Sequence, residues 1–349
     1  MFGRFMNNYY YGKSGKGDFR KEDMPQTRMQ LFWDTLRTRL SALCRLNLMY
    51  MVVFLPMMIV LMIGAYNLLN QVNLIYVAQQ GNLQEYVDAV NQQQNGEGAA
   101  QVTVSEELQS EIAATDVTQV VNSQILRTLL WLIPCFAITG PFTAGVSYVT
   151  RNWARDEHAF IWSDFKDAVK ANWKQSLVVS VITSILPAAI YVGWRYYGQM
   201  AGNSVIMIVP QVLVVLVGII WAISVTYMHP LIVTYELKQM DVFRNALLLG
   251  VARLPFSVGI RLLHCVPVIL WGIAVWFFGL DPMIGLLILG AYYVLIGFGL
   301  SRFITASYTN AVFDRFINSR IEGAKVNQGL READDDDEDE DEGNPETAD

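Results

Sequence analysis

Six stretches of the chain contain no Asp, Glu, Lys or Arg and are long enough to cross a lipid bilayer as helices. A membrane-spanning helix needs about 20 consecutive apolar residues. The predicted spans are 48–69, 129–149, 176–194, 205–227, 262–280 and 283–301. Only Asp281 and Pro282 separate the last two spans, which predicts a tight turn between them. The pattern therefore predicts an all-α fold, a polytopic membrane helical bundle with six transmembrane helices.

Amphipathic stretches precede the first, third and fifth spans. The clearest is 161–174, where Trp162, Phe165 and Trp173 recur at helical spacing opposite Lys and Asp residues. The corresponding stretches before the other two spans are 29–43 and 242–247, the latter with a weaker pattern. Helices of this kind lie along membrane surfaces, so we predict cytoplasmic interfacial amphipathic helices here. One such helix plus two spans would occur three times, either by triplication or because interfacial helices often precede spans without common ancestry.

Lysine and arginine are unevenly distributed between the spans. From the N-terminal segment onward, the seven segments outside the spans hold nine, one, five, one, four, none and five of these residues. Loops rich in Lys and Arg stay preferentially on the cytoplasmic side of a membrane. The alternation therefore predicts that both termini are cytoplasmic. No cleavable signal peptide is expected, because the first apolar stretch follows a long polar and basic segment.

The regions outside the spans differ in composition. Residues 1–27 are predicted to form a flexible basic arm and residues 332–349 a disordered acidic tail. The membrane domain covers 28–331 and contains an extracytoplasmic insertion, 71–125, which carries seven acids and no Lys or Arg before its end. Helical patterns in this insertion and a capping box that starts at Thr103 predict a helical protrusion. The insertion is either a contact surface for an extracytoplasmic partner or a solvated extension.

Composition favours a membrane protein and argues against an enzyme. Hydrophobic residues make up 53% of the 349 residues and charged residues 16%, with a mean hydropathy of +0.30. The net charge of −7 comes from the acidic tail. Ionisable groups inside spans mark most ion-coupled carriers and membrane hydrolases, and the predicted spans contain no Asp, Glu, Lys or Arg. The three His and three Cys residues lack metal-ligand spacing. No catalytic residue, metal or cofactor is therefore predicted.

The most distinctive segment runs from the second span into the loop that follows. Gly140, Pro141 and Gly145 belong to a stretch of small residues that allows close helix approach. A charged cluster follows, made up of Arg151, Arg155, Asp156 and Glu157. These side chains are expected either to pair at the cytoplasmic mouth or to form a plain solvated loop. Together with the three aromatic residues of 161–174, they are the candidate structural or interaction residues.

The sequence resembles the YesL-like family of bacterial membrane proteins, also known as DUF624. The resemblance rests on the segments FGRFMN, GPFTAG with YVTRNWARDE, FIWSDFKDAVKANWKQ and HPLIVTYELKQMDVFRNALLLGVARLP, and on a Leu-Pro pair in the first span. The acidic tail, the enlarged outer loop and the long segment before the first span depart from the family pattern. The resemblance implies a multi-pass protein of the bacterial cell membrane, associated with uptake of complex carbohydrates through binding-protein-dependent transporters.

The predicted function is that of an accessory or partner-binding membrane component linked to carbohydrate uptake. Its expected partners are the lipid bilayer and subunits of a binding-protein-dependent carbohydrate transporter, and no nucleic acid. The alternative is a small-solute permease, with a polar path between proline-kinked spans. A membrane enzyme is a third hypothesis, which the lack of buried ionisable residues disfavours.

Overall fold

The computed structural model describes residues 24–95 and 103–331. Regular structure within these ranges is helical, with no strand. In chain order the α-helices are α2 (Arg28–Met51), α3 (Leu55–Gln79), α4 (Leu83–Asn95), α5 (Glu106–Ala113), α6 (Val117–Ala137), α7 (Thr139–Trp153), α8 (Ser163–Ala201), α9 (Ile208–Thr234), α10 (Gln239–Ala252), α11 (Leu254–Phe278), α12 (Pro282–Tyr292) and α13 (Phe298–Phe316). The predicted acidic tail and the predicted basic arm up to residue 23 lie outside the described residues.

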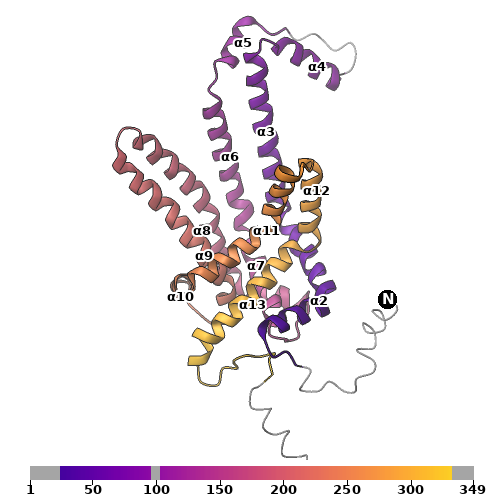
Figure 1. Ribbon diagram of the computed structural model, residues 1–349, viewed down its shortest axis with the longest axis vertical. Coiled ribbons are helices and arrows are strands. Elements are labelled where there is room, and N and C mark those ends of the chain that lie inside the picture. The colour runs from indigo at the N-terminus through magenta and orange to yellow at the C-terminus, as the bar shows by residue number, and fades with distance from the viewer. Residues whose placement is uncertain (1–23, 96–102, 332–349) are drawn as a thin grey trace, which may run out of the picture.

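Six helical segments of the described chain are, by length and composition, able to cross a membrane. They are formed by α2 with α3, by α6, α8, α9 and α11, and by α12 with α13. The predicted all-α bundle with six transmembrane helices is confirmed. Figure 1 shows two helical hairpins, α3 with α6 and α8 with α9, that extend in different directions from a common junction near α7 and α13.

The predicted second span, 129–149, is instead divided between two helices. A single residue, Ile138, separates α6 from α7. Pro141 is the third residue of α7 and has no N–H to donate to the Ala137 carbonyl, which favours a break here. Most residues of α7 are buried in protein. Its apolar character therefore reflects packing at the centre of the molecule, and α6 is the membrane-crossing helix.

The three predicted interfacial stretches are helical but differ in how they meet the next span. The first is the beginning of α2, which continues through a short 3₁₀ segment into α3. The second forms the first turns of α8, a 39-residue helix that runs without interruption through the third predicted span. The third, in α10, is a helix of its own, followed by α11. Two of the three stretches are therefore continuous with a span.

Two clusters of buried side chains hold the helices together. One joins α2, α7 and α13 through residues such as Tyr50, Trp153 and Phe303. The other joins α9, α10 and α13 around Tyr227 and Phe313. Outside these clusters, long parts of the spans expose apolar side chains. Helices that are apolar all round are typical of segments that contact lipid.

The outer insertion is helical in its described parts. α3 and α6 extend beyond the predicted spans, and α4 and α5 lie at their tip (Figure 1). Ser105 caps the N-terminus of α5, because its hydroxyl accepts a hydrogen bond from the Leu108 N–H at 3.2 Å. The capping residue predicted from the sequence was Thr103, two positions earlier. Residues 96–102, between α4 and α5, lie outside the described residues.

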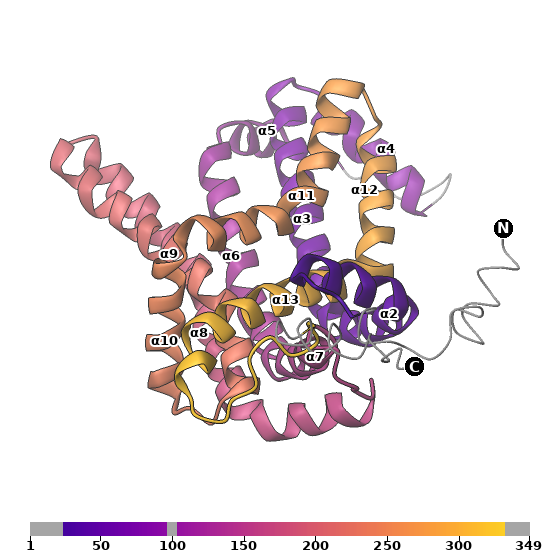
Figure 2. The same cartoon turned by 60° about the horizontal axis from the view of Figure 1, so that its bottom comes forward.

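The two ends of the described chain meet on one side of the molecule. The Arg331 N–H donates to the Pro25 carbonyl at 3.1 Å, and Arg28 forms an ion pair with Asp314. Figure 2 shows this end, where α2, α7 and α13 lie close together. An even number of crossings returns a chain to the side on which it started, so this arrangement agrees with six spans.

Candidate functional site

Gly140 and Gly145 set the spacing between α7 and α8. A Cβ atom at Gly140 would overlap the Ser180 hydroxyl and the Ser176 carbonyl. A Cβ atom at Gly145 would lie only 2.7 Å from the ring of Phe165. Small residues permit helices to approach this closely. The glycine-rich segment thus places α7 against α8 along its length.

The charged residues after α7 form a polar junction that reaches two distant parts of the chain. Arg155 pairs with Glu157 at 3.3 Å and donates to the Gln328 side chain at 2.5 Å. Asp156, whose φ is 57°, faces Arg39 of α2 at 3.9 Å. The loop after α7 is therefore joined both to α2 and to the segment that follows α13.

Arg151 is a half-buried arginine of this junction. Its guanidinium donates to the Asn152 side chain at 3.1 Å, and its carbonyl accepts from the Asn310 amide of α13 at 3.3 Å. Burial, and then the positive charge of Arg155, lower the pKa of Arg151 from its usual value. The bond from Asn310 to the Arg151 backbone carbonyl thus joins α13 to α7, whereas the guanidinium bonds within α7.

The predicted aromatic face of 161–174 has a buried and an exposed part. Phe165 is 6% exposed and packs against α7, whereas Trp162 and Trp173 are 66% and 47% exposed. The two tryptophans are about three helical turns apart and lie on the same side of the chain. Phe165 is displaced from that side toward α7. The structure therefore divides the three residues between packing and surface exposure.

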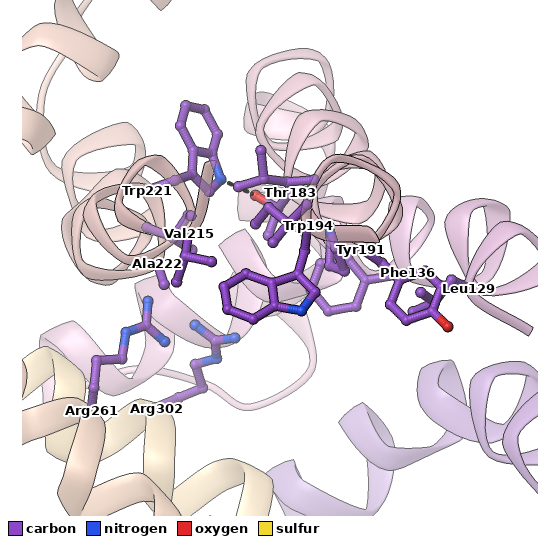
Figure 3. Close-up of a pocket in the computed structure, with 15 residues that line it drawn as sticks. Leu129, Phe136, Thr183, Tyr191, Trp194, Val215, Trp221, Ala222, Arg261 and Arg302 are labelled. Atoms are coloured by element: carbon purple, nitrogen blue, oxygen red, sulfur yellow. Dashed lines mark hydrogen bonds between the residues drawn. The ribbon is translucent and has the colours of Figure 1, made fainter. Parts of the chain in front are cut away.

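A cavity of about 900 Å³ lies between α6, α8, α9, α11 and α13. Its wall is mainly apolar and aromatic (Figure 3), with contributions from Leu129, Phe136, Trp194, Val215 and Trp221. The Trp221 indole N–H donates to the Thr183 hydroxyl at 3.1 Å across the wall. All five helices belong to candidate membrane spans, so the cavity lies within the membrane domain.

Two arginines project into this cavity. Figure 3 shows the guanidinium groups of Arg261 from α11 and Arg302 from α13 directed into it. Within residues 24–95 and 103–331, neither arginine has a hydrogen bond or an acidic partner. His229 is buried close to both, and neither of its ring nitrogens has a partner in the described chain. The His264 Nε2–H donates to the Ser301 carbonyl at 3.1 Å and fastens α11 to α13 beside them.

Sequence reasoning missed this site because it placed both arginines outside the spans. Arg261 was counted with the charges before the fifth predicted span, and Arg302 with those after the sixth. In the structure α11 begins seven residues before Arg261, so this arginine lies well inside the helix. Two antiparallel spans joined by a short turn bring their outer flanks together. The turn thus indicates that Arg261 and Arg302 lie near each other, but it does not indicate the cavity that they share.

The cavity has the chemistry of a binding site for an anion. Guanidinium groups stay charged and donate paired N–H groups to carboxylate or phosphate oxygens. The described residues contain no group of three or more His, Cys, Asp or Glu side chains that could hold a metal ion. The cavity thus offers a ligand positive charge, hydrogen-bond donors and a large apolar surface.

Comparison with known proteins finds a family model that matches the central part of the chain. The model of the family described as "Protein of unknown function, DUF624" matches residues 125–194. This region includes α7, most of α8 and the adjoining half of α6, and therefore the glycine contacts, the charged junction and part of the cavity wall. No curated protein and no solved structure matches the chain. Residues 125–194 are thus similar to the DUF624 family, which confirms the predicted resemblance over this part of the chain.

Proposed function

We propose that the protein is an accessory membrane component that binds a partner protein of a carbohydrate uptake system. The supporting observation is an exposed stripe at the N-terminal end of α8, formed by Trp162, Lys166 and Trp173 and here called the aromatic patch. It belongs to the family-matched region, and Phe165 anchors it to α7. Exposed tryptophans are enriched at the centres of protein interfaces.

The partner class comes from the family resemblance. The resemblance implies an association with binding-protein-dependent carbohydrate transporters, so the expected partners are membrane subunits of such a transporter. Association costs less entropy when the binding surface is already held rigid before the partner binds. The buried helix α7, packed on α8 through Gly140 and Gly145, provides that support.

Affinity purification in mild detergent tests the partner role. The full chain should copurify with membrane subunits of a carbohydrate transporter, and the variant Trp162→Ser/Trp173→Ser should lose most of them, because truncation of an interface tryptophan costs about 2 kcal/mol or more. Both side chains are exposed, so the melting temperature should stay close to that of the parent. Trp276→Ser, which alters an 83% exposed tryptophan of α11, is the matched control.

Two results would contradict this proposal in different ways. Unchanged copurification of the double variant would remove the aromatic patch from the interface. Absence of any transporter subunit from the parent preparation would contradict the partner role itself.

We further propose that both ends of the chain are cytoplasmic, as the Lys and Arg distribution indicates. With the three native cysteines replaced by serine, single cysteines at Gln93 and Ser204 should react with an impermeant thiol reagent in intact cells. A cysteine at Lys170 should react only after the membrane is opened. All three positions are exposed, so burial does not account for a failure to react. Reaction in intact cells at Lys170 alone would reverse the orientation.

The cavity favours a second candidate function, that of a small-solute permease. Its volume of about 900 Å³ lies within the range of ligand pockets, and five candidate spans surround it. Vesicles that contain only this protein should take up a solute if it is a permease. The accessory role instead requires that uptake depend on a transporter in the same membrane.

A further inference from the structure

Two arginines of the membrane domain face one cavity, and no acid of the described residues pairs with either of them. Arg261 and Arg302 both line it, and their guanidinium groups point the same way in Figure 3. We propose that the cavity binds an anionic lipid, with the lipid phosphate at the two arginines and its hydrocarbon against the aromatic wall. This site is independent of the aromatic patch and of the proposed partner role.

The charge balance of the described arginines is the first argument. Arg28 pairs with an acid, and Arg253 lies over the Phe256 ring at 4.3 Å. Arg261 and Arg302 have neither kind of contact in the part of the chain that the structure describes, and each is near the other's charge. A charged side chain within the membrane is costly and usually marks a ligand or ion site. An anion between two like charges offsets that cost directly.

The hydrogen-bonding groups of the cavity are the second argument. The Trp221 indole already donates to Thr183, and the Thr183 hydroxyl in turn donates to the Val179 carbonyl at 2.7 Å. The Tyr191 hydroxyl donates to the Asn122 side chain at 2.7 Å. The arginine N–H groups therefore remain as donors for a ligand. A neutral sugar presents many hydroxyl groups that need acceptors as well as donors, whereas a phosphate needs donors alone.

The remaining wall fits hydrocarbon. Side chains such as Leu129, Phe136 and Val215 offer no polar group, and the surrounding helices expose apolar side chains along the spans. A free phosphate at the arginines would occupy a small part of the roughly 900 Å³. A lipid fills the rest with its glycerol unit and the first part of its acyl chains. The shape of the cavity thus favours the phosphate of a lipid over a soluble phosphate.

Tryptophan fluorescence gives a direct test, because Trp194 and Trp221 line the cavity. The full chain is placed in phosphatidylcholine nanodiscs with an increasing fraction of phosphatidylglycerol whose acyl chains carry bromine, which quenches nearby tryptophan. We expect quenching that saturates at a low fraction of this anionic lipid, and weaker quenching by brominated phosphatidylcholine at the same fraction. The saturable part should disappear in the variant Trp194→Phe/Trp221→Phe.

Arginine variants test the role of the two charges. Arg261→Gln/Arg302→Gln should weaken the preference for the anionic lipid by about tenfold or more, since it removes both positive charges and their charge-assisted hydrogen bonds to the phosphate. Arg244→Gln, at an exposed position of α10, should keep the preference. Each single variant should show a preference for the anionic lipid between those of the parent and the double variant. The single variants test the proposal if the double variant does not fold.

Two results would overturn the proposal. One is an unchanged preference when either arginine is replaced. The other is displacement of the brominated phosphatidylglycerol by millimolar inorganic phosphate, which would make a soluble anion the occupant.

Discussion

Gly140→Ala should destabilise the protein strongly, although it adds a single methyl group. The new Cβ would overlap the Ser180 hydroxyl and the Ser176 carbonyl of α8. The hydroxyl can rotate away, but the carbonyl belongs to the backbone of a long helix and moves only if α7 and α8 separate. Overpacking of this kind costs about 1–3 kcal/mol of the free energy of unfolding, and occasionally more. We expect a clear fall in the melting temperature of the detergent-solubilised protein.

Gly272→Ala is the matched control. Gly272 also lies in a candidate membrane-crossing helix, α11, and beyond its own helix backbone no atom of the described residues lies within 4 Å of the position that its Cβ would take. Alanine favours a helix over glycine by about 1 kcal/mol, so this variant should melt at the parent temperature or slightly above it. Equal melting temperatures for the two alanine variants would show that α7 and α8 do not touch at Gly140.

The six spans could be predicted from the sequence because contact with lipid imposes long apolar runs on a helix. The same signal failed at 129–149, where the run continues into α7. That helix is apolar because protein surrounds it, and an apolar run does not by itself distinguish a buried helix from one that faces lipid. The pattern likewise grouped Phe165 with Trp162, although only the former is covered by α7.

The cavity and the polar junction could not be predicted because they depend on contacts between distant parts of the chain. The hydropathy pattern treats Arg261 and Arg302 as two separate flanking charges, and only the fold brings them to one cavity. Arg155 was expected to pair with a neighbouring acid, and it does pair with Glu157. Its further bond to Gln328 joins residues that no local pattern connects.

A second large effect is expected at Asn47, which is fully buried in α2. Its amide donates to the Tyr293 and Val294 carbonyls at 3.0 and 2.7 Å, and its side-chain oxygen accepts from the Gly299 N–H at 2.8 Å. The two carbonyls belong to the π-helical segment Tyr293–Gly297, which connects α12 to α13, and Gly299 lies in the first turn of α13. A π-helical turn shifts the backbone hydrogen bonds from the α-helical register. Inside a membrane no water replaces the lost partners.

Asn47→Leu keeps the number and branching of the side-chain heavy atoms and removes all three hydrogen bonds. Because each buried polar group left without a partner costs about 1–3 kcal/mol, the free energy of unfolding should fall by about 3 kcal/mol or more, measured by thermal unfolding in detergent. Asn172→Leu is the matched control, since the Asn172 amide donates only within its own helix, to Ala168 at 2.9 Å. If both leucine variants unfolded at the same temperature, the π-helical segment would not depend on α2 for its hydrogen bonds.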